Sequence, residues 1–190
     1  MITLPIAEGL TCFRGLSPKR SRFELEYALE RGSTANSFLF AAGPDRTGVT
    51  QTAVLVHPPG AAYASVFLPV LHQALPDPAF KLVVVVGHVN PNRVALLRDL
   101  ASAYSGLKLV ASNAGAKLLR ELWNLRRPPA PGDDTPQPPL PDLPEIQVIR
   151  QEQTLSVSHD YQLHVLPAPT PRWPGGLLAF EETLGLLMSD

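Results

Sequence analysis

The sequence has little cysteine, little charge and no long apolar run. Cys12 is the only cysteine in 190 residues, which excludes a disulfide framework and indicates a reducing compartment such as the cytoplasm. The net charge is −1 and charged residues make up 17%, so the broad basic field of a nucleic-acid-binding protein is excluded. Apolar runs fall short of the roughly 18 residues of a membrane span, and no signal peptide is recognisable. We therefore expect a cytoplasmic protein with no membrane span and no nucleic-acid partner.

Several catalytic motifs are also missing from the sequence. It contains no glycine-rich phosphate loop, no Walker motif and no Gly-x-Ser-x-Gly nucleophile turn. Four of the five histidines lie far apart with no ligand spacing and are interpreted as structural, namely His57, His72, His159 and His164. His88 alone stands in a stretch whose pattern suggests a site.

That stretch, residues 81–93 (KLVVVVGHVNPNR), organises the rest of the chain. A leucine and four valines form a short apolar run that suits a buried strand. Gly87 ends the run, and Pro91 in an Asn-Pro-Asn turn is placed to open a helix. From Val94 onward the apolar residues recur at helical spacing. The stretch therefore predicts a buried strand, a polar turn starting at His88 and a helix, and α/β folds build their sites at the carboxyl ends of such strands.

Strands and helices alternate between residues 51 and 125. We expect strands at 52–56 and 107–111, a helix over about 63–75 and a helix from 113 to about 125. Pro69 in the first of these helices indicates a kink or a later start. The alternation predicts an α/β layer with parallel strands.

The flanking regions have a β-like pattern. Residues 1–22 show little periodicity and are expected to form a solvated N-terminal segment, whereas residues 23–27 and 35–40 read as strands. Further short strands are expected at 146–150, 154–157 and 162–166, followed by a hairpin of 177–180 and 184–187. Together they predict a second sheet packed on the first, with helices outside and some apolar sheet surface left exposed.

Residues 127–144 interrupt the pattern with eight prolines and little that could be buried. Such a composition predicts a disordered, dispensable surface insertion. Its PxxP spacings leave open the alternative of a ligand for a polyproline-binding domain.

Three stretches point to a family: residues 22–38 (RFELEYALERGSTANSF), 87–93 (GHVNPNR) and 169–174 (PTPRWP). Together they resemble the N-terminal domain of cyanobacterial diflavin flavoproteins, which belong to the A-type flavoproteins or flavodiiron proteins. The resemblance implies an α/β fold of the metallo-β-lactamase-like αββα type. It also implies that residues 1–190 form one partial domain, incomplete at its C-terminus.

The same resemblance assigns family metal-ligand positions to six residues. His88 matches the first His ligand, Asn90 a Glu, Asn92 an Asp, Arg93 a His, Arg172 the next His and Asp190 the bridging Asp. Iron prefers carboxylates and neutral imidazoles. An amide oxygen is a weak ligand, and arginine stays protonated with no lone pair to offer. Only His88 and Asp190 keep the ligand type, so the site is predicted to be degenerate and metal-free, with Asp190 paired to Arg93 or Arg172.

Two hypotheses of function follow from this resemblance. The family implies NAD(P)H-dependent reduction of oxygen to water at a diiron site, with FMN and NAD(P)H bound in flavodoxin and reductase domains that this sequence lacks. In the first hypothesis the chain is the N-terminal portion of such a subunit, binds no cofactor itself and works as an electron sink in a homo- or hetero-oligomer with a related flavodiiron subunit. In the second it is a non-catalytic interaction or scaffold module, or a truncated gene product. A metal-dependent hydrolase of this fold is disfavoured by the missing ligands.

Overall fold

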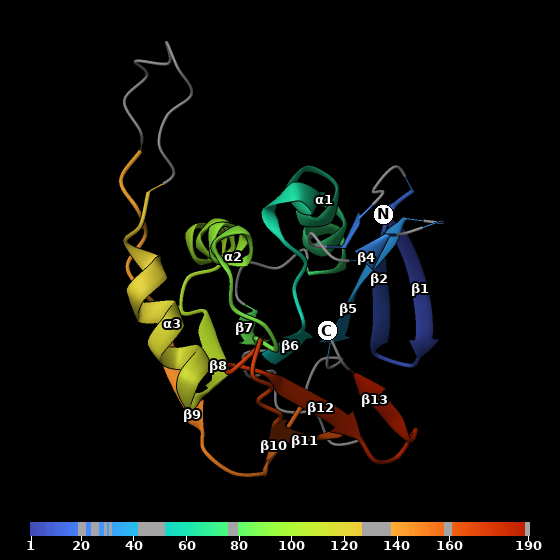
Figure 1. The fold of residues 1–190 in the computed structure, drawn as a ribbon. Coiled ribbons are helices and arrows are strands. Elements are labelled where there is room, and N and C mark those ends of the chain that lie inside the picture. Colours follow the sequence, from blue (N-terminus) through green and yellow to red (C-terminus); the bar gives the residue numbers. More distant parts are fainter. Residues whose placement is uncertain are drawn as a thin grey trace.

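The computed structural model describes residues 1–18, 22–23, 27–28, 30, 32–41, 52–75, 80–126, 138–157 and 161–188. Two sheets and a layer of helices form three layers (Figure 1). In spatial order the seven-stranded sheet contains β1 Ile2–Ala7, β2 Leu10–Ser17, β5 Ser33–Ala41, β6 Thr52–Val56, β7 Lys81–Val85, β8 Lys108–Ser112 and β9 Glu145–Ile149. The four-stranded sheet contains β10 Gln153–Ser156, β11 Gln162–Pro167, β12 Leu177–Glu181 and β13 Leu186–Met188. The helices are the 3-10 turn η1 Ala61–Tyr63, α1 Ala64–Ala74, α2 Pro91–Ala103 and α3 Asn113–Trp123.

The seven-stranded sheet is antiparallel in one half and parallel in the other. Strands β1, β2, β5 and β6 pair antiparallel, whereas β6, β7, β8 and β9 pair parallel. The parallel half requires crossover connections, and α1, α2 and α3 supply them. The predicted parallel α/β layer and the predicted buried strand after residue 81 are thus confirmed.

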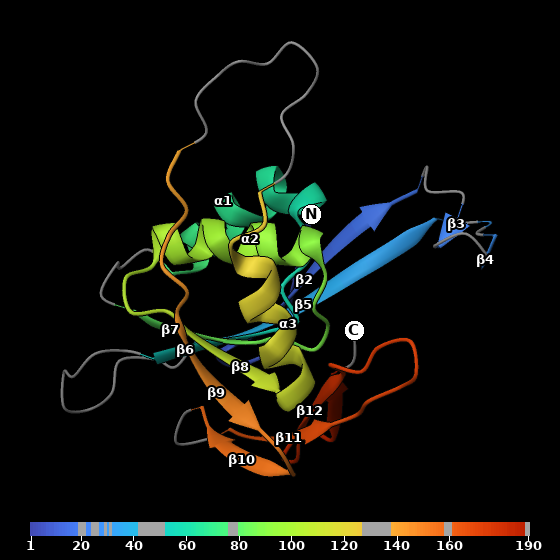
Figure 2. The same ribbon diagram turned by 60° about the vertical axis from the view of Figure 1, so that its left-hand side comes forward.

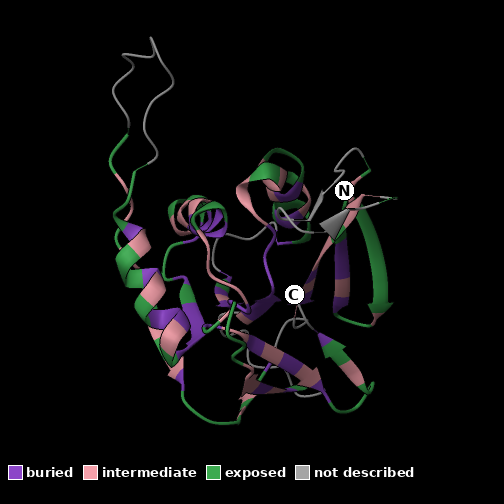
Figure 3. Ribbon diagram, viewed as in Figure 1, coloured by how far each residue is buried: buried purple, intermediate pink, exposed green. Residues whose placement is uncertain are grey.

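Both faces of β7 are buried, which explains its continuous run of valines. Successive side chains of a strand point to opposite faces. Val84 packs on the helix side with Leu97 and Leu119, while Val85 packs between the sheets with Val165. Figures 1 and 2 show the three helices on one face of this sheet and the four-stranded sheet on the other. Figure 3 shows that burial is concentrated where these layers meet.

Polar side chains form hydrogen bonds at the ends of α2 and α3. Asn90 and Ser112 cap α2 and α3, each through a side-chain oxygen that accepts a backbone N–H. At the other end of α3, the guanidinium of Arg98 donates to the carbonyls of Leu122, Trp123 and Leu125. Burial lowers the pKa of Arg98. Helix α1 contains Pro69 in its interior and does not start there.

Several sequence expectations were wrong. Residues 2–17 form the hairpin β1–β2 instead of an irregular segment. The expected strand at 23–27 is divided between β3 Arg22–Phe23 and β4 Tyr27–Ala28, which pair with each other at the far end of β2 and β5 (Figure 2). Strand β9 joins the first sheet, not the second. Within the described residues no helix covers the outer face of the four-stranded sheet.

Part of the proline-rich segment is packed against the core. The indole Nε1 of Trp123 donates to the carbonyl of Pro141 at 2.8 Å, and Leu143 packs on the helix-side core. Residues 138–144 are therefore packed in part, whereas the composition of 127–144 predicted a disordered insertion with little that could be buried. Residues 127–137 lie outside the described part of the chain, and for them the insertion stays a prediction.

Candidate functional site at the end of β7

The candidate site lies where β7 ends and α2 begins. Gly87 follows the strand, and its carbonyl accepts the backbone N–H of Leu177 at 3.2 Å, which joins this turn to the start of β12. His88 and Asn90 are half-buried in the turn. The turn is thus held between the two sheets, at the carboxyl edge of the parallel strands, as the sequence predicted.

Two of the presumed ligand positions are used to build the turn itself. The side-chain oxygen of Asn90 accepts the backbone N–H of Arg93 at 2.8 Å, so it serves as the N-cap of α2. The guanidinium Nη1 of Arg93 donates to the carbonyl of His88 at 3.1 Å, and Arg93 is only 8% exposed. Asn92 is exposed on the first turn of α2, near Gly60. The side chains of Asn90 and Arg93 therefore stabilise the local backbone.

The loop 168–176 closes over the ends of β7 and β8. Thr170 and Trp173 exchange backbone hydrogen bonds at 3.1 Å, which makes the loop compact. Its far end is fixed by the Ser112 hydroxyl, which donates to the carbonyl of Gly175 at 2.9 Å. A Cβ at Gly175 would lie 3.0 Å from the Cα of Gly115, so this close approach to α3 leaves little room for a side chain.

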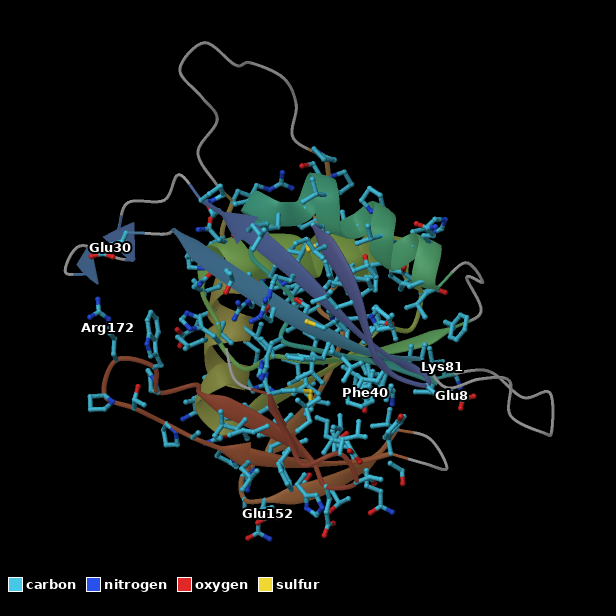
Figure 4. All side chains as sticks on the ribbon, turned by 90° about the vertical axis from the view of Figure 1, so that its right-hand side faces the viewer. Glu8, Glu30, Phe40, Lys81, Glu152 and Arg172 are labelled. Carbon is cyan, nitrogen blue, oxygen red and sulfur yellow. The ribbon has the colours of Figure 1, made fainter. Side chains whose placement is uncertain are left out.

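Trp173 covers His88. Their ring centroids are 4.0 Å apart with the ring planes at 51°. The guanidinium carbon of Arg172 lies 5.8 Å from the Trp173 ring centroid. Arg172 stands at the outer end of the loop (Figure 4). The aromatic ring of Trp173 is therefore a loop group packed on His88.

His57 ties the end of β6 to the second sheet. It is 1% exposed and has a left-handed backbone with φ of 56°, which is unusual for a residue other than glycine. Its Nε2 lies 3.1 Å from the carbonyl of Met188, and because a carbonyl only accepts, this nitrogen carries the proton. The Ser37 hydroxyl donates to the His57 carbonyl at 2.7 Å. Both contacts fit the structural role expected for His57.

The fold brings most of the predicted positions to one place. His88, Asn90, Asn92 and Arg93 lie on one turn, and the loop carrying Arg172 lies over it. Asp190, and with it the predicted pairing to Arg93 or Arg172, lies outside the described residues. Among the residues described, no group of three or more His, Cys, Asp or Glu side chains could hold a metal.

These side chains do not fit an iron centre. The Asn90 oxygen is already used as a cap, Arg93 is a cation within the turn, and Trp173 lies against His88. Sequence reasoning named the stretch 169–174 but did not place Trp173 against His88, and it missed the hydrogen bond between Ser112 and Gly175. Nothing in the Pro-Arg-Trp-Pro run indicates which ring the tryptophan meets.

Comparisons place the chain among known proteins. No protein-family model matches it. It is 33% identical over 187 residues to diflavin flavoprotein A 6 of Nostoc sp., a match that covers 98% of this chain and 28% of that protein. Against diflavin flavoprotein A 3 of Synechocystis sp. the identity is 32% over 186 residues, covering 98% of this chain and 27% of that protein. The chain thus spans less than a third of the length of these relatives.

Solved structures give the same result for the fold. The metal-soaked Flv1 flavodiiron core from Synechocystis sp. PCC6803 superposes with a TM-score of 0.78 at 30% identity, covering all of this chain and 41% of that one. A fragment, residues 1–254, of diflavin flavoprotein A 5 from Nostoc sp. PCC 7120 has a TM-score of 0.76 at 28% identity, and 64% of it is covered. The fold is therefore the α/β, metallo-β-lactamase-like fold of flavodiiron proteins, matched over the first part of those chains. No described helix is long and apolar enough to cross a membrane.

Proposed function

Because the chain belongs to the cyanobacterial diflavin flavoprotein family, as the N-terminal metallo-β-lactamase-like part of such a protein, we propose that it is a portion of a subunit involved in NAD(P)H-dependent reduction of oxygen to water. Its own site is degenerate and holds no metal. It acts in the cytoplasm as part of an electron sink, in an oligomer with a related flavodiiron subunit that has a complete site.

The arrangement of the turn after β7 supports the metal-free site in this proposal. The neutral amide oxygen of Asn90 is a weak ligand for iron, and it already accepts the backbone N–H of Arg93. Arg93 adds a positive charge, and two like charges about 4 Å apart repel by roughly 4 kcal/mol at an effective dielectric near 20, about twice that for a divalent ion. The positive charge of Arg93 therefore opposes a cation at this turn.

Iron content after expression with excess iron tests the metal-free site. We expect background iron in the wild-type chain and no change in His88→Ala. His72→Ala is the matched control, since His72 is an exposed histidine on α1. Stoichiometric iron that His88→Ala removes and His72→Ala retains would overturn the proposal.

The 190 residues should also bind no FMN tightly when isolated, because they match the metallo-β-lactamase-like part of these proteins and the resemblance assigns FMN to a different domain. The measurement is the visible absorption of protein purified from cells supplied with riboflavin. A flavin spectrum corresponding to one flavin per chain would contradict this expectation.

The second candidate function is a non-catalytic interaction or scaffold module. Exposed apolar side chains on β1 and β2, namely Ile2, Leu4, Ile6 and Leu16, favour it. The two candidates differ in one measurable property. An electron-sink subunit should raise the oxygen consumption of a complete flavodiiron partner, whereas a scaffold should bind its partner without that effect.

A further inference from the structure

A pocket of about 460 Å³ lies between the end of α2 and the segment that leads into β9. Figure 2 shows this segment running past the helices before it enters the sheet. Lys108 and Glu145 line the pocket and begin the parallel strands β8 and β9, so the pocket lies at the amino edge of these strands. The turn after β7 lies at their carboxyl edge, and the pocket therefore belongs to a separate place in the fold. Its volume falls within the range of small-molecule sites, about 300–1,000 Å³.

The buried part of the pocket lining is apolar apart from one hydroxyl group. Leu107 is buried, and Ala101 and Leu143 are half-buried. Tyr104 also lines the pocket although it is only 6% exposed, and within the described part of the chain its hydroxyl makes no hydrogen bond. Burial raises the pKa of this hydroxyl above its ordinary value of about 10, so it keeps its proton at neutral pH. Because a nearly buried hydroxyl gains from a polar partner, this lining suits an apolar group that carries a polar atom.

The exposed part of the lining carries an excess of negative charge. Its charged side chains are Lys108, Asp142 and Glu145, one positive and two negative, which give a net charge of −1. The Lys108 ammonium and the Glu145 carboxylate lie 2.7 Å apart and offset each other's charge. Asp142 supplies the remaining negative charge. The pocket therefore favours a cationic group over an anionic one.

Asp142 is held in position by the residues on either side of it. The carbonyl of Pro141 accepts the indole N–H of Trp123 at 2.8 Å, and Leu143 packs on the helix-side core. Pro141 and Pro144 also restrict the backbone, because the proline ring fixes φ. The carboxylate is thus presented to the pocket without a loop that must first become ordered, which lowers the entropic cost of binding a ligand.

We propose that this pocket binds a small organic cation, namely an ammonium group attached to a compact apolar body. The apolar body contacts Leu107, Leu143 and the ring of Tyr104. The ammonium group pairs with the Asp142 carboxylate and donates to the Tyr104 hydroxyl, since a hydroxyl oxygen can also accept a hydrogen bond. Asp142 sets the preference for positive charge, and the buried lining sets the size of the ligand.

The ligand site goes beyond the proposed function and does not depend on it. No residue of the turn after β7 takes part, so the iron and flavin measurements leave the site unaffected. Failure of the site would likewise leave the metal-free turn in place.

Three probes of similar size and different charge test the ligand class. Phenethylamine, phenylethanol and phenylpropanoate share an aromatic ring and are cationic, neutral and anionic at neutral pH. Each is titrated into the full 190-residue chain while the NMR shifts of the Leu107 and Leu143 amides are followed. We expect saturable shifts with the amine and binding of the alcohol that is weaker by about fivefold, the upper end for an exposed ion pair, with the carboxylate weaker still. Absence of saturable shifts with the amine, or equal affinity for all three probes, would overturn the proposal.

Two asparagine variants test the role of Asp142. Asp142→Asn removes the charge and keeps the shape of the side chain, so the amine should bind about fivefold more weakly and lose its advantage over the alcohol. Asp99→Asn is the matched control, because Asp99 is an exposed carboxylate on α2 that does not line the pocket. It should keep the preference for the amine. The same affinities in both variants would contradict the assignment of Asp142.

Two phenylalanine variants test the location. Ala101→Phe fills the pocket from α2 and should abolish the shifts caused by the amine. Ser102→Phe adds the same ring at the next position of α2, which is exposed and does not line the pocket, and binding should be unchanged. Retention of the amine by Ala101→Phe, or its loss in both variants, would show that the amine binds elsewhere and would overturn the proposal.

Discussion

Both faces of the seven-stranded sheet carry buried apolar side chains, but the two faces are unequally covered. On the helix side, α1, α2 and α3 bury the strands from β2 to β8, and Phe13 of β2 is 1% exposed. On the other side, the four strands β10 to β13 bury Val54, Val85 and Val110, yet Leu16 of β2 is 51% exposed. The comparison shows that alternation in a strand specifies which residues share a face and does not specify what covers it.

The largest effect is expected on the fully covered face. Leu97 of α2 is 0% exposed within the helix-side core. Leu97→Ala should lower the free energy of unfolding by about 2–5 kcal/mol, because it removes apolar contact and leaves a cavity that packed helices fill poorly. Denaturant unfolding measures the change. A loss below about 1 kcal/mol would mean that the helix layer is loosely packed.

A smaller loss is expected between the sheets. Leu163 of β11 is also 0% exposed, but its sheet has four strands and no described helix on its outer face, so we expect it to shift more readily toward a cavity. Leu163→Ala should lower the unfolding free energy by about 2–3 kcal/mol, the lower part of the range for such substitutions. Leu187→Ala on the same sheet is the control, since Leu187 is 57% exposed. If Leu163→Ala were as costly as Leu97→Ala, the two interfaces would be equally rigid.

The cap of α2 should contribute less than either core. Asn90→Ala removes the acceptor for the Arg93 N–H and should lower the unfolding free energy by about 1 kcal/mol. Asn90→Asp keeps an acceptor at the helix N-terminus and should retain stability. Thermal unfolding of the three proteins gives the order. Equal losses in both variants would show that the amide N–H groups of Asn90, and not its oxygen, matter.

The smallest effect concerns Cys12 of β2, which is buried and pairs with Leu4 of β1. Burial raises the pKa of its thiol, so the folded chain holds this proton more tightly than the unfolded chain. The resulting stability is fully present below the ordinary thiol pKa of about 8.5 and is lost as pH rises through the raised value. Urea unfolding from pH 7 to 10 should show this decline, and Cys12→Ala should remove it. Because burial also raises the pKa of Tyr104, the slope is compared in a Tyr104→Phe background.

The best-predicted elements are those whose local signals and burial agree. The strand, turn and helix of residues 81–93 were predicted correctly, because the valines, Asn90 and Pro91 each determine the conformation of the backbone next to them. The hairpin β1–β2 was missed because exposed apolar residues and Pro5 obscure its alternation. Strand β9 was assigned to the wrong sheet, since its pairing with β8 is a long-range contact that periodicity does not encode.

For the site, the sequence identified the turn and the loop but not how their side chains are used. Asn90 as a cap follows from its place before Pro91, a local relation. The contact of Trp173 with His88 depends on the loop's path across two sheets, which hydrogen bonds from Ser112 and Leu177 determine. Such contacts depend on tertiary packing and have no signature in residue spacing.

The loop 168–176 also bears on the order in which the chain folds. Its bond to Ser112 joins residues 63 positions apart, and the bond between His57 and Met188 joins residues 131 apart. Contacts of such separation form late, and during synthesis they must wait for β11 to β13 to leave the ribosome. The strand, turn and helix of residues 81–93 can assemble before that. We therefore expect the turn to reach its conformation early in the nascent chain and to be enclosed by Trp173 in the last step of folding.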